Sequence, residues 1–169
     1  MKAAVRPDME IWEALQKAET PAEREAVAAR LLTGDYSVVY RLVDALRERI
    51  RAFADGEADG VLALIGKAKA VLPEPGNVSP AWQNVWNKLE NMVRYKQQAL
   101  ETVPPEHRDG EWQVLVDNPF ENRETACYPG MTFDDAVFVY AKLRPELVEN
   151  EVIRLQKVVT HLTVTGADK

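Results

Sequence analysis

The sequence predicts a mainly α-helical protein: a helical bundle-like body followed by a small C-terminal β-hairpin plus two helices. Three observations support this fold class. Apolar residues recur at helical spacing over most of residues 8–102, the stretch "VPPEHRDG" interrupts the chain at 103–110, and "EWQVLVDNP" then alternates apolar and polar residues. We therefore expect a helical body at 1–102, a linker at 103–110 and a small α+β segment at 111–169 that packs on the body.

The helical body begins with two short helices. The stretch "RPDMEIWEALQKAE" places Trp12 and Leu15 on the same face of the first helix. The second helix is expected to have Thr20 as its N-cap, Glu23 closing a capping box and Gly34 as its stop.

Three further helices are expected before the linker. The first ends at Gly56 and the second is "EADGVLALIGKAKAVL", which the proline-rich "PEPGNVSP" terminates. Ser79 and Pro80 then start a long helix that runs to about Thr102. The apolar stripe of the first of these helices is Val39, Leu42, Val43, Leu46, Ile50 and Phe53. The stripe of the long helix is Trp82, Val85, Trp86, Leu89, Met92 and Val93.

The segment after the linker mixes strand and helix patterns. Trp112, Val114 and Val116 alternate with polar residues, and "RETACYP" is the expected antiparallel partner of that strand. Thr132 is expected to cap a buried helix. Pro145 starts a last helix, although the Val- and Thr-rich residues 158–165 are also compatible with a strand. Its apolar stripe is Val148, Val152, Leu155, Val159 and Leu162.

Composition limits the classes of function. The chain has 169 residues, 46% of them apolar and 28% charged, and its net charge is −6. Residues 1–100 contain 14 basic and 14 acidic residues, so 7 basic and 13 acidic residues remain for 101–169. An acidic C-terminal part repels phosphate backbones and disfavours nucleic acid as a partner.

The expected location of the protein is the cytoplasm. A single cysteine cannot form an internal disulfide, which is typical of a reducing compartment. The N-terminus lacks the apolar run of a signal peptide, and no segment approaches the roughly 18–20 apolar residues of a membrane-spanning helix. No membrane partner is therefore expected.

The sequence gives little support for an enzyme. Cys127 lies five residues before the expected helix start, among acidic residues that disfavour a thiolate, and a small buried side chain is the favoured interpretation. Cys127 or His161 in a pocket stays open as the basis of a small enzyme or ligand binder. Phosphate-binding loops, a serine-hydrolase elbow and ligand clusters are absent, so we expect no metal and no cofactor.

Two kinds of binding surface remain. The candidate nucleic-acid contacts are Arg47, Arg51, Lys88 and Arg94. Asp44 and Glu48 interleave with the arginines, which favours a solvated helix face. The candidate protein interface is Trp82, Trp86, Leu89 and Met92 on the long helix. We therefore predict a non-catalytic protein–protein interaction or regulatory module, with homodimerisation through the Trp-rich helix as one option and a nucleic-acid-associated regulator as the alternative.

Overall fold

A computed structural model of the chain shows two compact units, Met1–Gln97 and Gln98–Lys169. The predicted packing of one part on the other stays a prediction. The structure describes residues 13–33, 36–70, 80–120, 123–160 and 162–166.

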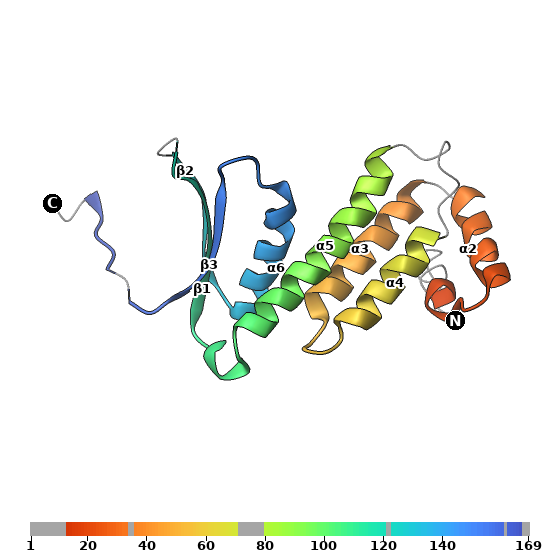
Figure 1. Ribbon diagram of the computed structural model, residues 1–169, viewed down its shortest axis with the longest axis horizontal. Coiled ribbons are helices and arrows are strands. Elements are labelled where there is room, and N and C mark those ends of the chain that lie inside the picture. Colours follow the sequence, from red (N-terminus) through yellow and green to blue (C-terminus); the bar gives the residue numbers. More distant parts are fainter. Residues whose placement is uncertain (1–12, 34–35, 71–79, 121–122, 161, 167–169) are drawn as a thin grey trace, which may run out of the picture. The chain divides into compact units, whose positions relative to one another are not determined.

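The first unit is helical. Residues 13–17 form a helical turn, followed by α2 (Pro21–Thr33), α3 (Tyr36–Ala52), α4 (Ala58–Ala70) and most of α5 (Pro80–Thr102). Figure 1 shows α3, α4 and α5, in orange, yellow and green, lying side by side with α4 antiparallel to its neighbours. The apolar stripes of these helices face one another in the core.

The predicted capping box at the start of α2 is confirmed. The backbone N–H of Thr20 donates to Oε2 of Glu23 over 3.0 Å, and the N–H of Glu23 donates to Oγ1 of Thr20 over 3.3 Å. Glu19 donates a second backbone N–H to the same carboxylate. These hydrogen bonds, above all that of the Thr20 backbone, lower the pKa of Glu23 below its ordinary value because they stabilise the ionised carboxylate.

The core of the first unit contains the predicted apolar series, as far as the structure describes them. The side chains of Val39 and Trp82 lie outside the described residues, as does Trp12. The buried members are Leu15, Leu42, Val43, Leu46, Ile50, Phe53, Val61, Ile65, Trp86, Leu89, Met92 and Val93.

The second unit is an α+β structure built on three strands. They are β1 (Glu111–Asn118), β2 (Arg123–Met131) and β3 (Val152–Val158), and α6 (Phe133–Leu143) connects β2 to β3 through the short helix η2 (Arg144–Glu146). The sheet is antiparallel with the order β2-β1-β3, so β1 is central. In Figure 1 α6 lies against one face of this sheet.

The predicted β-hairpin followed by two helices is wrong. The described residues contain a three-stranded sheet, and the expected last helix is replaced by β3. The stripe that suggested a helix is not buried there, since Val148, Val152, Val159 and Leu162 are exposed. The physical reason is pairing: a two-stranded ribbon is marginal in water, and "VIRLQKV" completes the hydrogen bonding of β1. The segment left open between helix and strand is strand only to Val158, and its other described residues form neither.

Local hydrogen bonds stabilise the start of α6 and the connection from α5 to β1. The hydroxyl of Thr132 accepts the N–H of Asp135 over 3.3 Å, which confirms Thr132 as the N-cap of α6. Before β1, the helix η1 (Pro105–His107) follows α5, and the guanidinium of Arg108 donates to the carbonyls of Leu100 and Val103, each over 2.8 Å. Arg108 thus satisfies carbonyl groups at the end of α5 that have no partner within the helix.

Candidate functional site

The described tryptophan of the α5 stripe, Trp86, lies inside the helical unit. Trp86 has 0% of its surface exposed, and Leu89 and Met92 are also buried, while the side chain of Trp82 lies outside the described residues. Buried side chains offer no area to a partner in this conformation. The indole N–H of Trp86 has no hydrogen-bond acceptor among the described residues, so its burial is driven by apolar contact.

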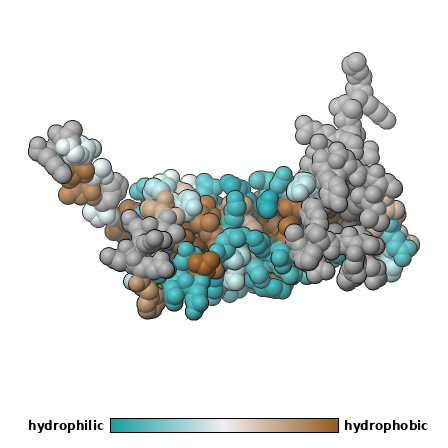
Figure 2. All heavy atoms as spheres, turned by 90° about the horizontal axis from the view of Figure 1, so that it is seen from above, coloured by the Kyte–Doolittle hydropathy of each residue, from teal (hydrophilic) through white to brown (hydrophobic). Residues whose placement is uncertain are grey.

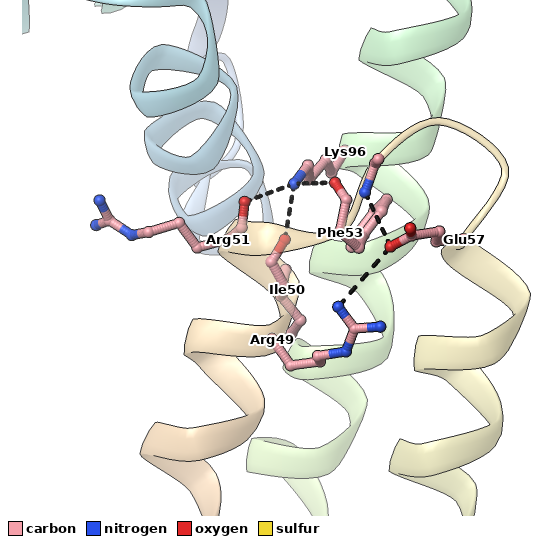
Figure 3. A network of polar contacts seen from close by, with 7 residues as sticks. Arg49, Ile50, Arg51, Phe53, Glu57 and Lys96 are labelled. Carbon is pink, nitrogen blue, oxygen red and sulfur yellow. Dashed lines mark hydrogen bonds and ion pairs between the residues drawn. The ribbon is translucent and has the colours of Figure 1, made fainter.

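A buried lysine of α5 is hydrogen-bonded to backbone carbonyls at the end of α3. Lys96 is 3% exposed, and its Nζ donates to the carbonyl oxygens of Ile50, Arg51 and Phe53 over 2.9, 2.8 and 2.8 Å. Figure 3 shows Lys96 reaching from α5 to the end of α3, where these carbonyls converge. The ammonium also lies 4.1 Å from the centre of the Phe53 ring. A cation at a helix C-terminus is favoured by the helix dipole, and the three acceptors satisfy all donors of the ammonium.

The turn that follows α3 is fixed by a second set of contacts in Figure 3. Oε2 of Glu57 accepts the backbone N–H of Ala54 over 3.2 Å and lies 3.8 Å from the guanidinium of Arg49. Together with Lys96, these contacts hold the short connection to α4. The arrangement is structural, and it removes the Lys96 charge from the surface.

The candidate nucleic-acid contacts lie on two helices of the first unit. Arg47 and Arg51 are on α3, and Lys88 and Arg94 are exposed on α5. Arg47 pairs with Asp44 at 3.3 Å, as the interleaved charges suggested. Charge pairing of this kind is typical of a solvated helix face and weakens the field available to a phosphate backbone.

Cys127 is exposed in the middle of β2, opposite Leu115 of β1, so the expected small buried side chain is wrong. Its strand position differs from the electropositive helix N-terminus that activates a thiol. His161 lies outside the described residues, and His107 is in η1. Within the described part of the chain, no group of three or more His, Cys, Asp or Glu residues is placed to hold a metal ion.

The two faces of the sheet differ. Trp112, Val114 and Val116 of β1 are buried on the face that α6 covers. The ring of Trp112 meets that of Phe133 in α6 edge-on, with centroids 4.9 Å apart. The matching buried residues of α6 are Phe133, Ala136, Val137, Phe138 and Ala141.

The opposite face carries polar pairs between β1 and β3. Nη1 of Arg154 lies 2.7 Å from Oδ2 of Asp117, and the amides of Gln113 and Gln156 are hydrogen-bonded over 3.3 Å. Leu115 lies among these positions and is half-buried. These cross-strand pairs stabilise the register of β3 on β1.

The two edges of the sheet also differ. The edge strand β2 contains Pro129 and Gly130, and Gly130 has a positive φ of 71°. Proline and an irregular backbone are common protections of an edge strand. The other edge strand, β3, contains neither residue, and no described strand pairs with its outer side.

Several exposed apolar side chains flank β3 in the sequence. Among the described residues, the large apolar side chains that are exposed lie in the second unit, with the exception of Tyr40. They are Phe120, Tyr128, Val148, Val152, Val159, Leu162 and Val164. Val159 and Leu162 are 88% and 89% exposed, and Figure 2 shows brown, apolar atoms at the surface of the C-terminal segment. We call the outer edge of β3, together with Val148, Val152, Val159, Leu162 and Val164, the β3 surface.

The sequence did not reveal the β3 surface, because the spacing of Val148, Val152, Val159 and Leu162 predicted a buried helical stripe. The signal that was present is the share of Val and Thr after Glu151, which favours extended structure.

Comparison with known proteins adds no assignment: the chain matches no family model, and no curated protein or solved structure is significantly similar to it. In the described part of the chain, no helix combines the length and the apolar character needed to cross a membrane.

Proposed function

We propose that this chain is a non-catalytic protein–protein interaction or regulatory module, and that its binding site is the β3 surface. The observation that carries the proposal is the coincidence of an open strand edge with exposed valine and leucine side chains at both ends of that strand. An open edge supplies a row of backbone donors and acceptors, and neighbouring apolar side chains supply area to bury.

The proposal moves the interface away from α5. Trp86, Leu89 and Met92 are buried inside the helical unit, so these three described side chains of α5 are not available to a partner. The exposed apolar residues of the second unit have no such role within their own unit. We also propose a cytoplasmic location, since the single thiol suits a reducing compartment.

Affinity capture with three forms of the full chain tests this function. The parent is compared with the triple variant Val159→Ser, Leu162→Ser, Val164→Ser and with the control Thr160→Ser, Thr163→Ser in the same segment. We expect the parent and the control to retain the same partner, whether a second copy or another protein, and the triple variant to lose it. Equal retention by all three forms would show that the β3 surface is not the binding site.

A nucleic-acid-associated regulator is the alternative, and it would use Arg47, Arg51, Lys88 and Arg94. It requires retardation of DNA or RNA at low salt that weakens steeply as salt rises. The pairing of Arg47 with Asp44 and the acidic balance of residues 101–169 favour the protein partner.

A further inference from the structure

The β3 strand has the properties of an edge that accepts another strand. It spans seven residues, and its inner side is fully paired with β1 from Glu111↔Val158 to Asp117↔Val152. Its outer side has no described partner strand. A strand of this length, without proline or glycine, is long enough for a regular ladder on its outer side.

The charges that usually protect an edge are neutralised within the chain. Arg154 pairs with Asp117, and Lys157 pairs with Asp109, with Nζ to Oδ1 at 2.5 Å. Lys157 also donates to the carbonyl of His107 over 3.4 Å. The hydrogen bond from Lys157 lowers the pKa of Asp109, so this partner stays ionised at neutral pH. Both cations of β3 are therefore held by carboxylates of their own copy.

Exposed apolar residues lie at both ends of β3, and they bear on the orientation of a second strand paired with it. Val148 and Val152 are exposed at its beginning, and Val159 and Leu162 are exposed beyond its end. In an antiparallel pair of identical strands, the beginning of one strand lies beside the end of the other. The exposed apolar residues of opposite ends then lie side by side, and a two-fold axis perpendicular to the sheet joins the same edge of two copies in this antiparallel direction.

We propose that two copies of the chain associate through their β3 strands, paired antiparallel about a two-fold axis, so that the two three-stranded sheets become one continuous sheet. This inference rests on the proposed function and names its partner as a second copy of the same chain. The sequence of β3 is compatible with a symmetric pair, because one full-length register places no like charges opposite each other.

That register is centred on Leu155. A two-fold axis across an antiparallel pair places one residue opposite its own copy, and only Leu155 as that residue pairs all seven positions. Val152 then lies opposite Val158 of the second copy, and Arg154 lies opposite Gln156 of the second copy. A centre at Arg154 or Lys157 would place like charges face to face, which destabilises a strand pair.

Sedimentation equilibrium of the full-length protein over a wide concentration range tests the association. We expect a dimer for the parent. Gln156→Arg places an arginine opposite Arg154 twice in each dimer, and we expect the dissociation constant to rise by about two- to thirtyfold. Gln156→Glu places a carboxylate there instead, and we expect equal or tighter association.

Gln113→Met is the control, because it removes the same hydrogen bond to Gln156 without adding a donor, and it lies on the central strand, away from the outer edge. We expect its dissociation constant to equal that of the parent. Circular dichroism of each variant confirms that the monomer is folded. Equal association of all four forms would place the dimer elsewhere and overturn the inference.

Disulfide cross-linking tests the register directly. In a Cys127→Ser background, Val152→Cys and Val158→Cys single variants are mixed and treated with a mild oxidant. We expect a covalent heterodimer from the mixture and no covalent dimer from either variant alone, because identical positions lie roughly 20 Å apart along the paired strands. Cross-links within each single variant would contradict the antiparallel register.

The failures of the two proposals are distinguishable. A parent that remains monomeric at all concentrations overturns the β3 dimer, and the proposed function stands if the parent still captures another protein that the Val159→Ser, Leu162→Ser, Val164→Ser variant loses. A monomer that captures nothing through this surface overturns both.

Discussion

The two units of this protein use apolar residues in opposite ways. The helical unit buries most described members of its apolar stripes, and the aromatic ring of Trp86 is fully enclosed. The sheet unit buries one face against α6 but leaves Val148, Val152, Val159 and Leu162 exposed around an open strand. Exposed apolar side chains beside unpaired backbone groups are the usual mark of an interaction site. We therefore propose the β3 surface, rather than the tryptophan-bearing helix α5, as the interaction site.

The largest effect on stability is expected at Trp86. Trp86→Ala should lower the free energy of unfolding by about 3–5 kcal/mol, because it leaves a cavity in the helical core. Trp86→Phe should cost clearly less, since it keeps most of the volume and removes a buried N–H that has no described acceptor. Urea denaturation monitored by circular dichroism measures both. A Trp86→Ala protein as stable as the parent would contradict the claim that Trp86 stabilises the helical core, and its side chain would then be available to a partner.

The second effect concerns Lys96. Lys96→Met keeps the length of the side chain but leaves the carbonyls of Ile50, Arg51 and Phe53 without their donor, and we expect a loss of about 2–4 kcal/mol. Lys88→Met, at an exposed position of the same helix, is the control and should stay within about 0.5 kcal/mol of the parent. Similar values for the two variants would show that the Lys96 ammonium does not stabilise the end of α3.

A smaller effect is expected in the sheet unit. Thr132→Ala removes the side-chain cap of α6 and should cost about 1 kcal/mol. Thr160→Ala, beyond the end of β3 and exposed, should leave the denaturation midpoint unchanged. If the two substitutions cost the same, the cap does not stabilise the helix that covers the sheet.

The smallest effect is the pH dependence of the capping box at α2. The folded-state pKa of Glu23 is lowered, so its stabilisation is complete above the ordinary value of 4.5 and is lost as the pH falls through the lowered value. The parent should therefore exceed Glu23→Gln in stability at neutral pH, and the difference should vanish in acid. Thermal melts of both proteins across this range measure it, and a constant difference at every pH would contradict the assignment.

Local signals predicted the parts of this structure that depend on neighbouring residues. The capping box of Thr20 and Glu23 and the cap at Thr132 follow from side chains three residues from their partners. The buried stripe of α3 follows from helical spacing along one element. These features need no knowledge of the rest of the chain.

Long-range pairing accounts for what the sequence did not reveal. Lys96 finds its acceptors 43 to 46 residues away, and a lysine on an apolar stripe gives no indication of which carbonyls will receive it. The spacing of Val148, Val152, Leu155, Val159 and Leu162 fits a helix, yet β3 forms because β1 offers it a ladder. The β3 surface depends on that non-local pairing, and it could be recognised only once the third strand was placed.

Hydrogen–deuterium exchange of the full chain at low and high protein concentration tests the central claim most directly, because it follows both units in one experiment. We expect the amides of β3 to gain protection as the protein concentration rises, and the amides around Trp86 in α5 to be protected equally at both concentrations. Protection that rises with concentration in α5 and stays constant in β3 would contradict it, and would return the interface to the tryptophan-bearing helix.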